Sequence, residues 1–267
     1  MSFTLVSAPE EGRALRERHR PRYLASLTAP MDDMWMSFAE EAAVHGLHVD
    51  GVEAGSLCVD GEGRLLRLWI EPAFQGRAEE LLAFAAGRLG FREARLPTLD
   101  PLALGVALDV AREVESVSLF FAHGEDPVVA PLEGLVPGEP EDHGRLVTFE
   151  EAATGAPRAF LEGYVRERLD RRELWLHLEA GEILAVGELR RDPWQAGVAH
   201  LGLMVAEDRR GEGLGSRLLS ALVERGRGEG LRLACSTEKD HLGARRAIDR
   251  AGFRPLHRLL RVVLELD

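Results

Sequence analysis

The sequence predicts a mixed α/β protein built from two similar halves. Apolar runs typical of strands alternate with segments of helical periodicity along most of the 267 residues. One such run, His200–Val205, leads through three glycines into the helical segment Arg217–Arg225. An offset of 135 residues, which lays Ile70 under Val205, pairs the strands and helices of the first half with those of the second.

Composition excludes several classes of protein. A net charge of −12 argues against a nucleic-acid partner, because phosphate binding needs a basic surface. The two cysteines, Cys58 and Cys235, lack metal-ligand spacing and favour a reducing compartment, and we expect no metal. The segment Met1–Val6 does not resemble a signal peptide, and no apolar run is long enough to span a membrane. We therefore expect a cytoplasmic protein that does not bind membranes.

The first half reads in order as two helices, a meander of strands, and a strand–helix–strand alternation. Asp50-Gly51 is a typical hairpin turn within the meander. The expected elements are helices over 8–27 and 32–44, strands over 47–49, 54–59 and 65–70, a helix around 81–89, a strand over 94–98, a helix from 100, and a closing strand over 114–121.

The second half repeats this order after a stretch without periodicity. Residues 122–144 alternate prolines, glycines and acidic residues, which is linker composition. Thr148-Phe149-Glu150-Glu151 matches a capping box, and Phe160, Leu161, Tyr164 and Leu169 are spaced as one face of a helix. Strands over 174–178, 183–189, 200–205, 231–236 and 258–264 follow, with helices over 217–225 and from near Asp240. The predicted domains are 1–122 and 145–267, joined by a linker over 123–144.

The three glycines after Val205 indicate an anion site. Glycine permits positive φ angles and a close approach of another molecule to the backbone. The first amides of a helix have no internal acceptor and lie at the positive end of its dipole. A strand-to-helix turn of this kind suits a phosphate group. The spacing Gly211-x-Gly213-x-Gly215 is neither a P-loop nor a good dinucleotide fingerprint, and a simple tight turn remains the alternative.

This segment resembles the pyrophosphate loop of the GNAT superfamily of N-acetyltransferases, Gln/Arg-x-x-Gly-x-Gly/Ala, with Arg210, Gly213 and Gly215 in the pattern. The resemblance implies that backbone amides of the loop hold the pyrophosphate of acetyl-CoA, and that the preceding strand carries a bulge whose amide faces the thioester. The acetyl-CoA-binding residues it implies are Leu203, Met204, Val205, Arg210, Gly211, Glu212, Gly213, Leu214, Gly215, Ser216 and His241.

A second segment, 236–253, supports the resemblance. It is similar to the family's later motif, in which a strand is followed by Asn-x-x-Ala and by a helix that ends in Gly-Phe. Ala244 and Gly252-Phe253 match this motif. His241 stands where asparagine is usual, and Ile248 stands where many members carry a tyrosine that protonates the leaving thiolate. The general acid is therefore not identified.

Acetyl transfer to an amine calls for a base. The resemblance places it on the strands beside the thioester, where Glu188 and His200 are the candidates. Glu188 could equally be a surface carboxylate at a strand end, and His200 a partly buried structural histidine. The acceptor could be an amine of a small molecule or of a peptide.

The fold class that follows is α/β, with two tandem GNAT-like folds, each a mixed and mostly antiparallel sheet flanked by helices. The first is expected to be degenerate, because Ala78 and Glu80 stand where the second half has Gly213 and Gly215. The predicted function is acetyl-CoA-dependent N-acetyltransfer. The alternative is a catalytically silent CoA-binding regulatory or scaffold module. A homodimer stays open.

Overall fold

The computed structural model describes residues 2–266, and its contacts divide the chain into two compact units. Unit 1 comprises Met1–Leu119 together with His257–Asp267, and unit 2 comprises Phe120–Leu256. The chain thus enters unit 2 once and ends in unit 1. Within residues 2–266, no helix combines the length and the apolar character needed to cross a membrane.

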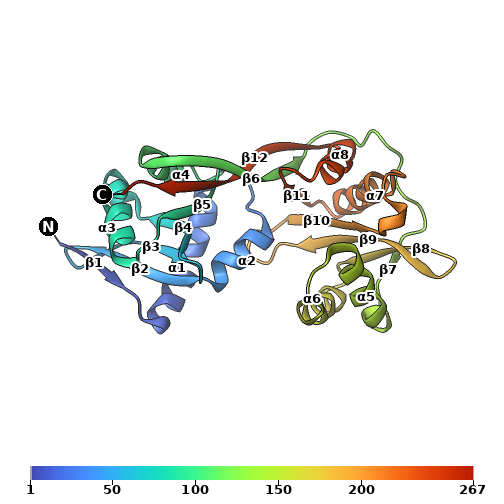
Figure 1. Ribbon diagram of the computed structural model, residues 1–267, viewed down its shortest axis with the longest axis horizontal. Helices are drawn as coiled ribbons and strands as arrows, with labels where there is room; N and C mark the ends of the chain where they lie inside the picture. The colour runs from blue at the N-terminus through green and yellow to red at the C-terminus, as the bar shows by residue number, and fades with distance from the viewer. Residues whose placement is uncertain (1, 267) are drawn as a thin grey trace. The chain divides into compact units, whose positions relative to one another are not determined.

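Unit 1 holds the expected elements of the first half in order, preceded by a strand over Phe3–Val6 that was not expected, and with the second helix ending at Glu41, before the predicted Val44 (Figure 1). The elements of unit 1 are β1 (Phe3–Val6), α1 (Pro9–Ser26), α2 (Asp33–Glu41), β2 (Ala43–Val49), β3 (Val52–Val59), β4 (Arg64–Ile70), a 3-10 helix (Pro72–Arg77), α3 (Ala78–Leu89), β5 (Glu93–Pro97), α4 (Pro101–Asp109) and the first part of β6 (Ala111–His123).

Unit 2 repeats this order. Its elements are β7 (Val136–Pro137), a 3-10 helix (Pro140–Asp142), α5 (His143–Thr154), α6 (Arg158–Asp170), β8 (Leu174–Glu179), β9 (Glu182–Arg191), β10 (Val198–Val205), a 3-10 helix (Glu207–Arg209), α7 (Leu214–Gly228), β11 (Arg232–Glu238), α8 (Leu242–Arg250) and the first part of β12 (Phe253–Leu264).

The sheets of the two units have matching topology. In unit 1 the strands follow the order β1-β2-β3-β4-β5-β12, and in unit 2 the order β7-β8-β9-β10-β11-β6. Neighbouring strands from β1 to β12 in the first order and from β7 to β11 in the second run antiparallel, except for one parallel pair in each unit, β4 with β5 and β10 with β11. The predicted fold class, two mixed and mostly antiparallel sheets with flanking helices, is confirmed.

The edge of β5 in unit 1 is completed by the end of the chain. Residues 259–263 of β12 pair antiparallel with residues 93–97 of β5. Val262 is fully buried in the core that α3 and α4 form with the sheet of unit 1. The closing strand of the second half therefore stabilises the first unit.

Helices cover both faces of the sheet in unit 2 (Figure 1). Helix α7 packs against one face of β9 and β10, and α5 and α6 lie on the other. A Cβ on Gly187 would lie 2.8 Å from a Leu222 methyl group and 3.0 Å from one of Leu218, so glycine permits the close approach of α7. Leu161, Val165 and Leu169 form the buried side of α6, whereas Phe160, expected on that face, is 59% exposed. The helical face is therefore rotated from the prediction.

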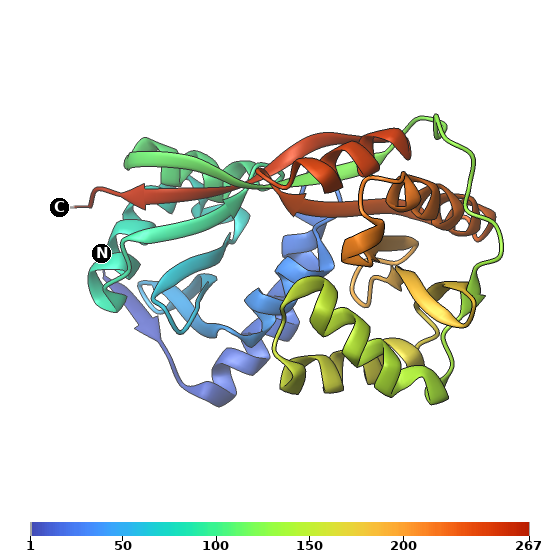
Figure 2. The ribbon, with the colours of Figure 1, turned by 45° about the vertical axis from the view of Figure 1, so that its right-hand side comes forward.

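The segment between β6 and β7, part of the predicted linker, follows the surface of unit 2 (Figure 2). Its backbone N–H groups at Val128 and Leu132 donate to the carbonyls of Arg250 and Arg217, and the Leu132 side chain is buried beside Leu218. These bonds fix the segment to helices α8 and α7.

Candidate active site

The turn between β10 and α7 exposes backbone at the helix N-terminus. Gly211 and Gly213 both adopt left-handed conformations, with φ of 87° and 84°. A Cβ built on either would meet no atom within 4 Å, so the space beside both residues is open. The next residue, Leu214, begins α7, whose first amides have no acceptor within the helix. Bare amides, helix dipole and open space together fit a pyrophosphate group.

Gly215 and Ser216 shape this turn from inside. A Cβ on Gly215 would lie 3.0 Å from a Leu203 methyl group and 3.6 Å from the Cβ of Ala247, so glycine brings α7 close to β10 and α8. The buried Ser216 hydroxyl donates to the Gly213 carbonyl at 3.0 Å. Ser216 therefore offers a ligand its backbone amide, while its side chain holds the turn.

Charged side chains tie the turn to its surroundings. Arg210 donates to the carbonyl of Ala153 at the end of α5, at 2.7 Å. Arg209 pairs with Glu212 at 3.0 Å and with Glu179 at 2.8 Å, and all three are solvent-exposed to some degree. Arg210 is exposed and adds positive charge beside the bare amides.

Strand β10 separates from β11 as it approaches the turn. Their parallel ladder joins residues 198–200 to residues 232–234 and extends no further among the described residues, although β10 continues to Val205. Leu203 and Val205 pack on the α7 side of the sheet and Met204 on the α5–α6 side. The register of β10 with β9 is continuous over Ala199–Val205. The prediction of a bulge in β10 is therefore wrong for its ladder with β9. The backbone edge of β10 that faces β11 is left for another partner.

Glu188 lies in a buried polar network on the α5–α6 face. It pairs in register with Gly202, inside the segment of β10 that has parted from β11. Both of its carboxylate oxygens lie 3.0 Å from the Tyr164 hydroxyl, and Arg190 forms an ion pair with it. A Cβ on Gly202 would lie 2.5 Å from Glu188 Oε2 and 2.9 Å from Arg190 Nη1. Glycine at 202 thus makes room for the Glu188–Arg190 pair.

His200 lies on the same sheet face as Glu188, because it is two residues from Gly202 along β10. It is fully buried, and its Nε2 lies 2.8 Å from Asp192 Oδ2. Asp192 Oδ1 accepts the backbone N–H groups of Trp194 and Gln195, which shape the turn between β9 and β10. The two candidate bases therefore share a face, but His200 lies where β10 is still paired with β11.

Two residues near Glu188, Glu150 and Tyr164, were not predicted from the sequence as site residues. Glu150, expected in a capping box, lies in the middle of α5, which already begins at His143. It is 1% exposed, and its Oε1 has no hydrogen-bond partner among the described residues. Burial, and next the nearby Glu188 charge, raise the pKa of Glu150 to about 8. Burial also raises the pKa of Tyr164. In the sequence, Glu150 and Tyr164 are marked only by their helical spacing. That spacing does not distinguish core residues from site residues.

The later motif contributes less. His241 precedes α8 as its N-cap residue, its ring makes no capping hydrogen bond, and it is exposed. Ile248 is buried at 3% exposure within α8. No proton donor therefore stands at the position where the family resemblance implies a tyrosine.

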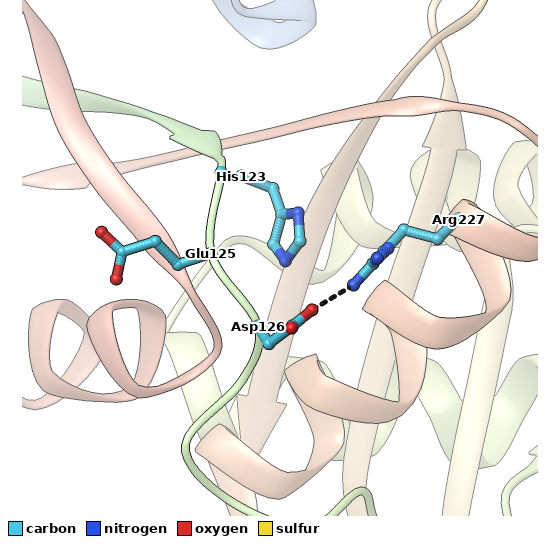
Figure 3. Close-up of a pocket in the computed structure, with 5 residues that line it drawn as sticks. His123, Glu125, Asp126 and Arg227 are labelled. Atoms are coloured by element: carbon cyan, nitrogen blue, oxygen red, sulfur yellow. Dashed lines mark hydrogen bonds and ion pairs between the residues drawn. The ribbon is translucent and has the colours of Figure 1, made fainter.

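A surface pocket lies elsewhere in unit 2, after β6 (Figure 3). It is lined by His123, Gly124, Glu125, Asp126 and Arg227. The Asp126–Arg227 ion pair at 2.7 Å is exposed on both sides, and His123 stacks edge-on against Phe253. None of the residues expected to bind acetyl-CoA or to catalyse lines this pocket.

The comparisons with known proteins agree with the fold. Residues 16–124 match the model described as acetyltransferase (GNAT) domain, and residues 143–253 match that of the acetyltransferase (GNAT) family. The two units thus define the class, a tandem acetyltransferase fold. Because the two matches together cover most of the chain, the chain belongs to the GNAT family, with two such domains in tandem. No curated protein sequence matches it.

Solved structures resemble the whole chain. An acetyltransferase of the GNAT family from Colwellia psychrerythraea is 27% identical, with a TM-score of 0.91, covering 99% of this chain and 100% of that one. A tandem GNAT protein from the clavulanic acid biosynthesis pathway, solved without acetyl-CoA, is 18% identical with a TM-score of 0.69, covering 100% and 99%. A GCN5-related N-acetyltransferase from Sphaerobacter thermophilus is 16% identical with a TM-score of 0.65, covering 98% and 95%.

Proposed function

We propose that the chain transfers an acetyl group from acetyl-CoA to an amine of a small molecule or a peptide. The observation that carries the proposal is the turn before α7. Gly211 and Gly213 leave open space beside bare helix amides, and the parted edge of β10 leads to this turn. We assign the pyrophosphate of acetyl-CoA to residues 210–216. We assign the part of acetyl-CoA between its pyrophosphate and its thioester to the backbone edge of Leu203–Val205 that faces β11.

Transfer joins the amine nitrogen to the acetyl carbon and breaks the carbon–sulfur bond. The nitrogen must lose a proton, which for an alkyl amine of pKa near 10.4 costs about 4.6 kcal/mol at pH 7. We assign the proton acceptor role to Glu188, because it lies opposite Gly202 in the parted segment of β10. Tyr164 and Arg190 hold its carboxylate in place. His200, bound to Asp192, serves better as a positioning residue for the β9–β10 turn.

Calorimetry with acetyl-CoA, followed by a thiol-release assay with a panel of amines, tests the proposal. Binding together with amine-dependent thiol release is the expected result. Binding without release for any amine would favour the catalytically silent CoA-binding module, which the buried Ile248 motivates. An absence of binding would contradict both.

Whether Glu188 or His200 accepts the proton is decided by pH–rate profiles of the variants Glu188→Gln and His200→Gln. Loss of the base removes the rising limb of the profile, whereas loss of a positioning residue lowers the rate at every pH. We expect the first behaviour for Glu188→Gln and the second for His200→Gln.

A further inference from the structure

Helix α5 buries an ionisable residue that nothing in the structure balances. Its buried face presents Leu146 and Val147 to the apolar core and, one turn later, Glu150. Glu150 Oε1 is buried without a hydrogen-bond partner among the described residues. A buried polar atom without a partner costs free energy, so such groups in folded proteins call for an explanation.

Glu150 lies beside the network that holds Glu188. Helix α5 packs on α6 and on β10, and the Glu188 charge acts on the Glu150 carboxyl. The charged and titratable groups on the elements around this face are Glu188 and Arg190 on β9, Tyr164 and Arg168 on α6, and His200 on β10. Arg190 neutralises Glu188, and Arg168 pairs with Glu173 at 2.7 Å. Among the carboxyl groups on this face, Glu150 is thus the one with no ion-pair partner in the described residues. A cation that enters here would therefore meet a carboxyl group that is free to bind it.

We propose that Glu150 and Glu188 together bind the ammonium group of the acceptor, so that the acceptor is an alkyl ammonium ion. The inference rests on the proposed function and names its substrate class. An ammonium group carries three N–H donors, and Glu150 Oε1 offers an unused acceptor beside Glu188. When the ammonium ion enters, Glu150 releases its proton to solvent, and the charge of the site is unchanged.

An aromatic pair lies next to the proposed site. The ring of Phe160, which is exposed, stacks on Tyr164 with the centroids 5.5 Å apart, and the Tyr164 hydroxyl donates to Glu188. The two rings thus extend from the surface toward the buried carboxylate. Because methylene groups pack well on aromatic rings, an unbranched alkylammonium ion is the probe chosen for the test.

The test follows the carboxyl groups of the free protein by NMR, with glutamate labelled at the side-chain carboxyl carbon and without acetyl-CoA. One resonance should titrate with a pKa of about 8, disappear in Glu150→Gln, and persist in Glu151→Gln, which removes the exposed neighbouring carboxylate that pairs with Arg158. Added n-butylammonium chloride should lower this pKa by roughly one unit or more, because an opposite charge favours the ionised carboxyl. The uncharged isostere 1-butanol, at matched sodium chloride, should leave it unchanged.

Two results would overturn the site: a resonance near pH 8 that survives in Glu150→Gln, or an n-butylammonium titration that matches the 1-butanol control. Either can occur while thiol release with other amines succeeds, and then acetyl transfer stands and only the acceptor class fails. Conversely, n-butylammonium could lower the pKa of Glu150 while no amine gives thiol release. That result would support the ammonium site and contradict the proposed acetyl transfer.

Discussion

The turn before α7 in unit 2 leaves the helix amides bare, whereas in unit 1 a 3-10 helix precedes α3 and its Gln75 carbonyl accepts the N–H of Ala78. Gly213 has a φ of 84°, but Arg77, just before α3, has a φ of −122°. Glu80, in the first turn of α3, forms an ion pair with Arg77 at 2.7 Å. The first turn of α3 thus already carries a carboxylate, where the first turn of α7 has none.

The backbone of the two turns also differs. Seven residues separate β4 from α3, and a 3-10 helix, Pro72–Arg77, runs directly into the α-helix. Eight residues separate β10 from α7, and the extra length is taken up by an extended Arg210 followed by two left-handed glycines. The strand-to-helix connection alone is therefore enough for the fold, while the anion site depends on glycines at two positions.

A second difference lies on the opposite face of each sheet. In unit 1, His19 of α1 is buried, with Nδ1 2.8 Å from the Ser56 hydroxyl and Nε2 2.9 Å from Glu53. Gly55 makes this possible: at the irregularity there, Trp69 comes so close that no Cβ fits, and Glu53 and Ser56 both face α1. In unit 2, Glu150 of α5 has an oxygen without a partner. Around His19 the polar groups therefore pair with one another, whereas Glu150 Oε1 has no hydrogen-bond partner among the described residues.

The largest effect should separate the two units at Glu188 and Glu53, which correspond at the 135-residue offset. Glu188→Gln should lower kcat by roughly 10² to 10⁴, the usual contribution of a general base, with little change in acetyl-CoA affinity. Glu53→Gln should leave kcat within about twofold, since its carboxylate serves His19 and Arg18. Steady-state kinetics measures kcat for both variants, and thermal unfolding curves check that both are folded. Equal losses of kcat in the two variants would contradict the claim that only unit 2 carries the base.

Glu188 could be proposed as a candidate from the sequence because it lies on a strand near a recognisable loop. The loop is recognisable because its glycines are a local pattern. The partners of Glu188 could not be predicted. The Thr148-x-x-Glu151 spacing indicated a helix start, but α5 had begun at His143, and only tertiary packing shows that Glu150 faces the core. Tyr164 was assigned to a buried helix face, without its bond to Glu188.

Strand partners were equally out of reach. The apolar runs that close the two halves, 114–121 and 258–264, have the same pattern, so nothing local determines which strand completes which sheet. The pairing of β12 with β5 comes from the fold of the whole chain. The order of elements and the strand–turn–helix at 200–216 were predictable, because their signals lie within a few residues of each other.

A smaller effect compares the two turns directly. Gly213→Asp adds a side chain at a left-handed residue and a negative charge at the start of α7, so acetyl-CoA affinity should fall roughly tenfold or more. The matched variant Arg77→Asp, at the residue that precedes α3 as Gly213 precedes α7, should leave the affinity unchanged. Calorimetry on both variants checks this. A similar loss in Arg77→Asp would show that unit 1 also contributes to binding.

A third effect concerns the dependence of stability on pH. Because burial raises the pKa of Glu150 from its usual 4.5 to about 8 in the folded protein, this group contributes stability that is fully present below the unfolded pKa and is lost as the pH rises through about 8. Wild type should therefore lose a few kcal/mol at most between pH 5 and pH 9, at about 1.4 kcal/mol per unit, and Glu150→Gln should lose less. Denaturant unfolding at both pH values measures this, and identical losses in wild type and variant would refute the assignment.

The same denaturation experiment separates the units at His19. In His19→Ala, Ser56 and Glu53 lose their buried partner, so we expect a loss of about 1–3 kcal/mol at pH 7. Glu150→Gln, at the corresponding helix of unit 2, should be neutral or stabilising at this pH. A stabilising His19→Ala would show that the unit 1 cluster is under strain and not mutually satisfied.

The number of acetyl-CoA molecules bound per chain tests the central claim most directly. Isothermal titration of the wild-type chain, with protein concentration fixed by amino-acid analysis, should give one acetyl-CoA per chain. The affinity of that single site should fall roughly tenfold or more in Gly213→Asp, because within residues 2–266 only the turn before α7 combines left-handed glycines with bare helix amides. A stoichiometry of two, or one site that keeps its affinity in Gly213→Asp and loses it in Arg77→Asp, would contradict the account.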